Sequence, residues 1–292
     1  MQVVALRQPD RIRAFLWADR FFADYALGDL DPAHFPFTEW FAAEDGGALR
    51  AVVMLYNDLN PPILFATGEA RAIEAILDRA VSVPEIGISI RDEHLSSVEK
   101  FYRAEPIPML KMALLPEDFR LVLVPSSVTL SAAKSLWTQR EILRRFAAQN
   151  DTDPLIEWRE ALAMTRLNIV HMPLLEELYS YGGGDAFRQR SLELGVFYGV
   201  FDGERLVAVA GTHIVSDNER IAALGNVMTH PAYRGRGLAT IATSAVCEEL
   251  LDRGIELVGL SVGRSNEAAI RVYEKIGFKR HAPFFEGTAI RN

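Results

Sequence analysis

The sequence GNVMTHPAYRGRGLA occupies residues 225–239 and decides how the rest of the chain is interpreted. An apolar run is followed by a turn at His230-Pro231 and then by a stretch rich in glycine and arginine that opens a helix. This arrangement of strand, turn and helix leaves several backbone N–H groups unpaired at the positive end of the helix dipole. The segment therefore predicts a binding site for an anion, and a diphosphate would suit it.

The residue types of this loop fit that prediction. Two glycines let the backbone come close to a ligand where a Cβ would intrude, and two arginines add positive charge beside it. The residues expected to hold the phosphates are Arg234, Gly235, Arg236, Gly237, Leu238 and Ala239.

Composition limits the classes of function. The chain has 292 residues, of which 49% are hydrophobic, so it is long enough for one large or two ordinary domains with real cores. It carries 31 Lys and Arg against 39 Asp and Glu, and the net charge of −8 argues against a nucleic-acid surface. The sequence contains no run of about 18 apolar residues, and its N-terminus lacks the apolar core of a signal peptide. We expect a soluble, cytoplasmic protein that binds neither nucleic acid nor membrane.

Metal and thiol chemistry are not expected. The six histidines show no close ligand spacing, and a single cysteine, Cys247, provides neither a zinc pattern nor a disulfide framework. Cys247 has no basic neighbour in the sequence, which favours an inert thiol over a nucleophile.

The first half of the chain predicts alternating strands and helices. Apolar spacing favours one helix over residues 11–27. The elements expected after it are strands over 49–56, 63–67, 85–90 and 109–115 and helices over 70–80 and 93–102. The same order of strands and helices is expected in the second half, described next. This repetition suggests an internal duplication. In such a duplication, residues 66–70 would stand where the phosphate loop should be. With one glycine, no arginine and an acidic side chain they would bind diphosphate poorly.

The connection and the second half complete the prediction. The connection is expected to contain a strand over 121–124 and helices over 131–148 and 155–164, with Trp137 and Trp158 as packing anchors. The elements expected in the second half are a helix over 174–181, strands over 195–201 and 205–215 joined by a hairpin turn at Asp202-Gly203, a strand over 221–229, a helix over 238–253, a strand over 257–262, and a helix over 266–276 that ends at Gly277.

Two motifs of the second half resemble those of the GNAT superfamily of N-acetyltransferases. The loop contains Arg234-x-x-Gly237-x-Ala239, which matches the family pattern of Arg or Gln, two residues, Gly, one residue, and Gly or Ala. Residues 266–278, NEAAIRVYEKIGF, match the second family pattern, N-x-x-A-x-x-x-Y-x-x-x-G-F. The resemblance covers residues 166–292.

This resemblance implies a fold of the α/β (α+β) class with a mixed, splayed central sheet flanked by helices. Acyl-CoA would lie in the notch between the strands at 221–229 and 257–262. The backbone of Val227, Met228 and Thr229 would pair with the pantetheine arm as an added strand, and the loop amides would hold the pyrophosphate. The resemblance also places Asn266 and Ala269 at the cofactor.

Tyr273 matches the family position whose hydroxyl protonates the leaving thiolate. An ordinary core role is the alternative, because Tyr273 lies near the apolar stripe of its helix.

The sequence leaves open which residue acts as the general base. Many members of the family use a glutamate on the strand before the loop, and here the strand at 221–229 has no carboxylate. Asn226 can position a water but cannot accept a proton at pH 7. The other candidates are His213, His230 and Glu286, each of which also has a structural explanation, and an amine of low pKa would need no base.

We therefore expect a tandem protein in which residues 1–120 form a degenerate GNAT-like domain, 121–165 a connection, and 166–292 an acyl-CoA-binding domain. The arrangement is similar to tandem members with a broken first domain, such as the glycine N-acyltransferase-like branch. The expected reaction is transfer of an acetyl or other short acyl group from CoA to the amine of a small molecule. Acetyl-CoA would be the co-substrate, no metal would take part, and the protein would be a monomer or homodimer.

Two other classes of function compete with this one. A non-catalytic acyl-CoA sensor or interaction module is favoured by the missing strand carboxylate. A nucleotide-binding protein is disfavoured because Leu-Ala follows the glycine loop in place of Lys and Ser or Thr.

Overall fold

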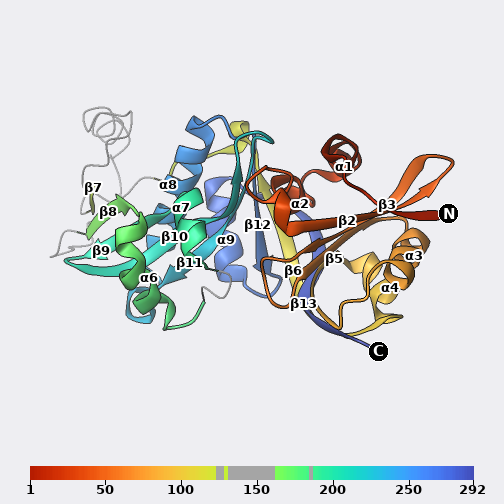
Figure 1. Ribbon diagram of the computed structural model, residues 1–292. Helices are drawn as coiled ribbons and strands as arrows, with labels where there is room; N and C mark the ends of the chain where they lie inside the picture. Colours follow the sequence, from red (N-terminus) through yellow and green to blue (C-terminus); the bar gives the residue numbers. More distant parts are fainter. Residues whose placement is uncertain (123–127, 131–161, 184–186) are drawn as a thin grey trace. The chain divides into compact units, whose positions relative to one another are not determined.

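The structure is a computed structural model that describes residues 1–122, 128–130, 162–183 and 187–292. The chain divides into two compact units, each made of segments that are separate in the sequence. The first unit contains residues 1–118, 214–223 and 254–292, and the second contains residues 119–213 and 224–253. Figure 1 labels their helices and strands.

The first unit is built on a sheet in the order β1-β2-β3-β4-β5-β13-β6-β12. Neighbouring strands are antiparallel except β4 and β5, which run parallel. The strands are β1 (Gln2–Ala5), β2 (Thr38–Asp45), β3 (Ala48–Tyr56), β4 (Ile63–Gly68), β5 (Glu85–Arg91), β6 (Tyr102–Leu114), β12 (Leu257–Gly263) and β13 (Lys279–Arg291).

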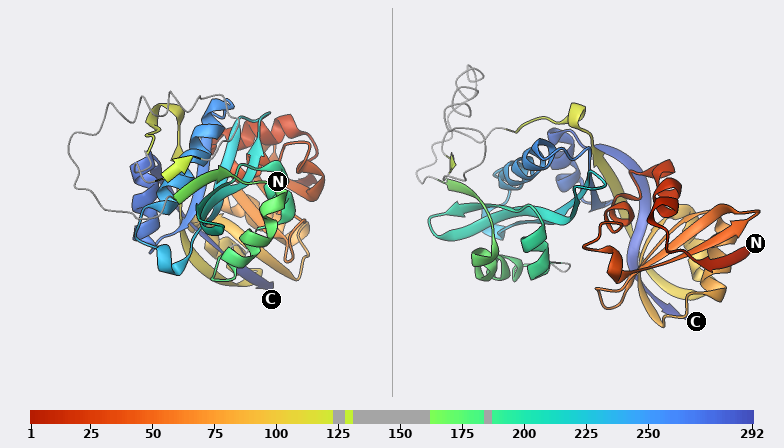
Figure 2. Two further views of the ribbon diagram at one scale, coloured as in Figure 1. Left: turned by 90° about the vertical axis from the view of Figure 1, so that its left-hand side faces the viewer. Right: turned by 45° about the horizontal axis from the view of Figure 1, so that its top comes forward.

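The last strand of the chain, β13, lies between β5 and β6. It pairs with β5 along residues 284–290 and with β6 along residues 279–291, with one register shift near residue 281. In Figures 1 and 2 the blue ribbon of β13 runs beside the yellow ribbon of β6. Strand β13, at the C-terminal end of the sequence, therefore fills the place between two strands that both come from the first 114 residues.

Helices cover both faces of this sheet, because its strands direct successive apolar residues to opposite faces. Side chains of α1 and α2 form one core with Trp40 and Val52, and side chains of α3 and α4 form another with Val53 and Leu64. Val52 and Val53 belong to different cores, as the two-residue period of a strand requires. The helices are α1 (Pro9–Leu16), α2 (Asp24–Gly28), α3 (Ala70–Arg79), α4 (Leu95–Glu99) and, after β12, α9 (Glu267–Ile276).

The single helix predicted over residues 11–27 is wrong. The chain forms α1, the short 3₁₀ helix η1 (Trp17–Asp19), a turn, and then α2. Asp19 causes the break, because its carbonyl accepts from the amides of Phe22 and Ala23 and its carboxylate also accepts from Phe22 N–H. A short acidic side chain that bonds its own backbone competes with a continuous helix.

The other predictions for the first half are mostly confirmed. The strands at 49–56, 63–67 and 85–90 and the helix at 70–80 correspond to β3, β4, β5 and α3. The helix predicted over 93–102 is shorter, since it consists of η3 (Asp92–His94) and α4, and β6 already begins at Tyr102. Strands β1 and β2 have no counterpart in the prediction. Their sequences, QVVA and TEWFAAED, alternate too weakly to mark a strand.

The second unit contains a smaller sheet. Strand β7 pairs with β8 in parallel, and β8 to β10 pair antiparallel. The chain then continues through β11 and α8. The elements are β7 (Val128–Leu130), β8 (Leu162–Arg166), η5 (Ile169–His171), α6 (Met172–Tyr179), α7 (Gln189–Leu194), β9 (Tyr198–Asp202), β10 (Arg205–Ser216), β11 (Ile221–Thr229), η6 (Pro231–Tyr233) and α8 (Leu238–Asp252).

The predicted hairpin at Asp202-Gly203 is confirmed by the β9–β10 pairing, and β11, α8, β12 and α9 match their predictions to within one residue at each end. Helix α7 was not expected. Residues 162–164, predicted as the end of a helix, belong to strand β8. Residues 123–124, the helix predicted over 131–148, the start of the helix over 155–164, and both Trp137 and Trp158 lie outside the described residues.

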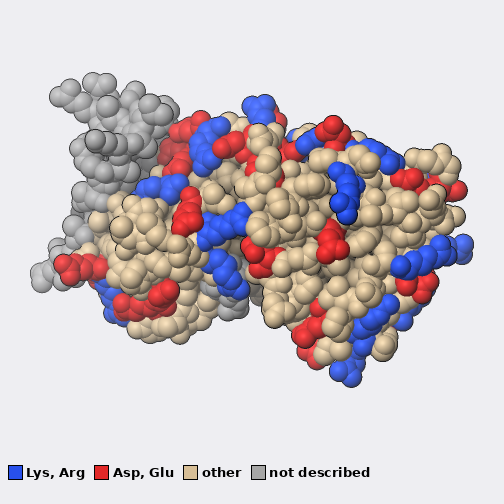
Figure 3. All heavy atoms as spheres, in the orientation of Figure 1, with Lys and Arg blue, Asp and Glu red and all other residues tan. Residues whose placement is uncertain are grey.

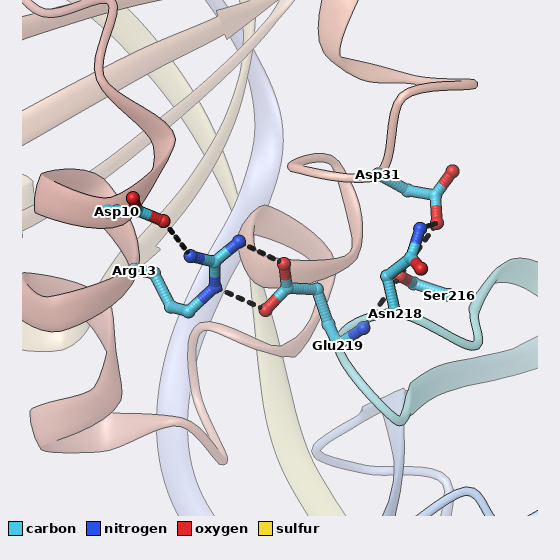
Figure 4. A network of polar contacts seen from close by, with 6 residues as sticks. All are labelled: Asp10, Arg13, Asp31, Ser216, Asn218 and Glu219. Carbon is cyan, nitrogen blue, oxygen red and sulfur yellow. Dashed lines mark hydrogen bonds and ion pairs between the residues drawn. The ribbon is translucent and has the colours of Figure 1, made fainter.

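A partly buried ion pair attaches the turn after β10 to α1 within the first unit (Figure 4). Arg13 binds Glu219 with two bonds, Nη2 to Oε1 at 2.6 Å and Nε to Oε2 at 2.8 Å, and the Glu219 side chain is 5% exposed. The Ser216 hydroxyl accepts from Glu219 N–H at 3.1 Å and donates to Asp31 at 2.9 Å, and Asn218 also donates to Asp31. These contacts join residues that are about 200 positions apart in the sequence.

We expect Arg13→Ala to lower the free energy of unfolding by about 2 kcal/mol, because it leaves the buried Glu219 carboxylate without its charged donor. Urea denaturation measures this. Arg11→Ala is the matched control, since Arg11 pairs with Glu44 at 2.9 Å but its side chain is 43% exposed, and its loss should cost at most about 0.5 kcal/mol. Equal effects of the two substitutions would contradict the assignment.

Candidate functional site

The loop between β11 and α8 has the open geometry that its sequence predicts. Residues 234–237 are exposed, and Gly235 and Gly237 both have φ +76°, the left-handed region that glycine adopts at little cost. A Cβ built on either glycine would meet no described atom within 4 Å. The space beside the backbone is therefore open to a ligand.

Helix α8 begins without a side-chain cap. Gly237 is its N-cap residue, and the bond from Ile241 N–H to the Gly237 carbonyl, 3.1 Å long, is the first along the helix. The amides of the first turn consequently lack the side-chain partner that usually satisfies them. A helix of 15 residues directs its positive end at this opening, which suits an anion.

His230 anchors the start of this loop. The ring packs against Tyr181 and Tyr233 at centroid distances of 4.4 and 5.6 Å. Its Nδ1 faces the amide of Ala232 at 3.2 Å, and its Nε2 faces the Arg205 guanidinium at 2.8 Å. Burial, and then the charge of Arg205, lowers the pKa of His230. Both ring nitrogens face N–H donors, so neither is placed to take a proton from a substrate.

The backbone is turned at Asn226, one residue before the segment expected to bind pantetheine. Asn226 has φ +52° inside β11, where an ordinary side chain is strained. Its carbonyl accepts from the Tyr179 hydroxyl at 2.8 Å, and its amide nitrogen donates to the Thr212 carbonyl at 3.3 Å. Val227 and Thr229 are partly exposed and Met228 is buried. The strand is thus locally twisted and pinned at the point where the predicted ligand contacts begin.

His213 lies against the same part of β11. A Cβ on Gly225 would clash with the His213 ring, so only glycine lets the ring approach this closely. His213 Nδ1 is 3.4 Å from the Asn226 amide nitrogen.

Helix α9 carries the second motif. The expected cap is confirmed, since Asn266 Oδ1 accepts from Ala269 N–H at 3.1 Å. The helix ends at Gly277, whose φ of +115° and close approach to the Asp118 carbonyl both require glycine. Tyr273 is 7% exposed and packs edge-on against Phe278 at 5.8 Å.

The predicted site residues fall into two groups. Residues 227–229 and the phosphate-binding residues 234–239 belong to the second unit, while Asn266, Ala269 and Tyr273 belong to the first. Each group is ordered by contacts inside its own unit.

A polar cluster that no motif marks lies beneath α2. Lys111 Nζ is 2.8 Å from Asp24 Oδ1 and 3.2 Å from Ser261 Oγ, and the Lys111 and Asp24 side chains are 2% and 0% exposed. The sequence holds one signal for this pair, because each is a lone charged residue in an apolar run, FFADYAL and MLKMALL. Glu286 on β13 is partly exposed, and burial raises the pKa of its carboxyl group.

Burial disfavours thiol chemistry at Cys247. Cys247 is fully buried, and burial raises the pKa of its thiol. No three described His, Cys, Asp or Glu residues gather as they would around a metal ion. In the described part of the chain, every helix is too short or too polar to cross a membrane. Charges of both signs are interspersed on the face drawn in Figure 3.

The turn between β4 and α3 in the first half is much shorter than the loop before α8. Strand β4 ends at Gly68 and α3 begins at Ala70, so Glu69 alone separates them, whereas residues 230–237 separate β11 from α8. A Cβ on Gly68 would clash with the Arg50 carbonyl, so protein backbone fills this position.

Comparison with known proteins identifies the family. Residues 157–278 match the acetyltransferase (GNAT) family model. [Ribosomal protein bS18]-alanine N-acetyltransferase of Salmonella typhimurium is 37% identical over 75 residues, which are 26% of this chain and 49% of that protein. Mycothiol acetyltransferase of Tsukamurella paurometabola is 31% identical over 109 residues, which are 36% of this chain and 37% of that protein. The chain thus spans about half or less of the length of these relatives.

A solved structure matches almost the whole chain. A tandem GNAT protein from the clavulanic acid biosynthesis pathway superposes with a TM-score of 0.52 at 15% identity, covering 99% of this chain and 98% of that one. Identity this low relates the folds alone, and it confirms the predicted fold class and its tandem architecture. Residues 157–278 of this chain belong to the GNAT family of acetyltransferases.

Proposed function

We propose that this protein is an N-acyltransferase that moves an acetyl or other short acyl group from CoA to the amine of a small molecule. The observation that carries the proposal is the uncapped N-terminus of α8 behind two left-handed glycines, inside a GNAT domain. The diphosphate of CoA needs N–H donors and positive charge, which the first-turn amides and two exposed arginines supply. Both relatives named above are acetyltransferases.

The proposed cofactor contacts are those that the resemblance to the GNAT family implies. The backbone of Val227, Met228 and Thr229 would pair with pantetheine, and the amides of residues 234–239 would hold the pyrophosphate. Asn266 would contact the cofactor through its amide nitrogen, because its oxygen caps α9. Ala269 lies next to it in the first turn of that helix.

The reaction needs one new bond and one broken bond. The amine nitrogen attacks the thioester carbonyl carbon, the C–S bond breaks, and the amine loses a proton. Tyr273 would donate its hydroxyl proton to the leaving thiolate. Backbone donors beside the turned residue Asn226 would stabilise the charge that develops on the carbonyl oxygen.

The proposed organisation is a tandem of a degenerate domain over residues 1–120, a connection over 121–165, and an acyl-CoA-binding domain over 166–292. The single-residue turn at Glu69 supports the view that the first half has lost its phosphate site. A cytoplasmic monomer or homodimer that uses no metal completes the proposal.

Calorimetric titration with acetyl-CoA tests the proposal. We expect one site per chain, because the loop before α8 has amides without a side-chain cap beside open space, whereas protein backbone closes on Gly68 at the turn before α3. Absence of binding would contradict the function, and two sites would contradict the assignment of the first half. Binding without release of thiol, with every amine tried, would favour a non-catalytic sensor.

Substitution of Gly237 tests the phosphate site. Gly237→Asp should weaken acetyl-CoA binding at least about 100-fold, because a carboxylate would enter the open space beside the diphosphate. Gly237→Asn is the matched control, since asparagine has the same shape, tolerates a left-handed backbone and carries no charge. It should keep most of the affinity. Similar losses in both variants would show that charge is not the cause.

Removal of the Tyr273 hydroxyl tests the acid. Tyr273→Phe should lower kcat by about 100-fold while the Kd of acetyl-CoA changes little, because the hydroxyl acts on the leaving group. Tyr102→Phe is the control, since its buried hydroxyl donates to the Val83 carbonyl at 3.0 Å and takes no part in the proposed reaction. An unchanged kcat in Tyr273→Phe would return this residue to an ordinary core role.

A further inference from the structure

Asn226 interrupts the regular backbone of β11 inside the strand. Its φ of +52° lies in the left-handed region, and the residue is 8% exposed. A buried strand residue other than glycine keeps such a backbone only where the surrounding contacts enforce it, and strain of this kind gathers at functional sites. The contacts that hold Asn226 therefore point to residues that serve the site.

Three contacts hold Asn226 in this conformation. Its side-chain amide nitrogen donates to the Thr212 carbonyl at 3.3 Å and lies 3.4 Å from His213 Nδ1. Its main-chain carbonyl oxygen accepts from the Tyr179 hydroxyl at 2.8 Å, the shortest of the three contacts. The first two contacts come from the neighbouring strand β10, and the third comes from α6. Of the three, the contact with Tyr179 is the one that acts on the peptide group itself.

The core of the second unit fixes the position of Tyr179. Tyr179 is the last residue of α6, and its ring packs against the buried cluster around Leu175 and Phe197. The Phe187 ring lies beside it, with the two centroids 5.1 Å apart. Burial raises the pKa of Tyr179, so its hydroxyl stays protonated near neutral pH. The hydroxyl is therefore a permanent donor, aimed at the Asn226 carbonyl.

The peptide group between Asn226 and Val227 transmits this contact. The group is planar and trans, so the Asn226 carbonyl and the Val227 N–H point in opposite directions. Because Tyr179 holds the carbonyl, it also sets the direction of the Val227 N–H. A hydrogen bond to the carbonyl polarises the peptide group as well and makes its N–H a stronger donor. The Val227 amide is one of the backbone donors beside Asn226 that the proposed reaction uses.

We propose that Tyr179 is a positioning residue of the acyl transfer, whose hydroxyl orients the peptide group of Asn226 and Val227 so that the Val227 N–H faces the thioester carbonyl oxygen. The inference rests on the proposed function and adds a residue that neither motif contains. Negative charge develops on that oxygen as the amine nitrogen bonds to the carbonyl carbon, and it returns to the carbonyl when the C–S bond breaks. Tyr179 acts through the backbone and touches no reacting atom.

Infrared spectroscopy of bound acetyl-CoA, labelled with carbon-13 at the thioester carbonyl, tests this role without any acceptor amine. The label separates the thioester band from those of the protein, and an excess of protein keeps all the acetyl-CoA bound. A carbonyl oxygen that accepts a hydrogen bond absorbs at lower frequency, so the wild-type complex should absorb below free acetyl-CoA. Tyr179→Phe keeps the ring in the core and should lose most of this shift, with the Kd of acetyl-CoA little changed.

Tyr198→Phe is the matched control, because Tyr198 is a partly exposed tyrosine on β9 of the same unit. It should keep the wild-type band. A wild-type band in Tyr179→Phe, or no shift in the wild-type complex, would overturn the assignment. Loss of acetyl-CoA affinity in Tyr179→Phe would overturn it too, because that result marks a structural residue. A wild-type protein that binds no acetyl-CoA would overturn the proposed function instead, so the two failures are distinct.

Discussion

The insertion of β13 between β5 and β6 is the constraint on which the first unit depends. Both edges of β13 are hydrogen-bonded, so without this strand two long rows of backbone groups in the middle of the sheet would lack partners. Its partners lie nearly 200 residues earlier in the chain, and closing such a loop costs entropy that local contacts cannot offset. The first half of the sequence consequently completes its sheet only when the last strand has joined it.

The same strand carries part of the core. Phe284 is fully buried, with its ring 5.8 Å from that of Phe22 and 5.4 Å from Lys111 Nζ. A shift of the register by one residue would turn Phe284 to the opposite face of the sheet. The packing of this aromatic ring therefore helps to fix the register of β13.

Local signals made the second half predictable, and the lack of such signals explains what was missed. Gly237, Asn266 and Gly277 act on their own helix ends, so their neighbours in the sequence were sufficient to place α8 and α9. Asp24 and Lys111 meet across 87 positions, and a lone charge in an apolar run indicates that a partner exists without naming it. The place of β13 in the sheet is likewise a matter of distant pairing. The cofactor roles of the motif residues are implied by the resemblance to the family. Local physical signals alone do not indicate these roles.

The two strand-to-helix turns differ in length and in the space beside their glycines. At β4 and α3 one residue joins the elements, and the Arg50 carbonyl occupies the space where a ligand would approach Gly68. At β11 and α8 the longer loop is held open by His230 between two tyrosine rings, and its glycines face open space. Both helices offer amides at their N-termini, but only the second has them accessible. The length of the connection, and not the presence of the helix, therefore decides which helix N-terminus is accessible.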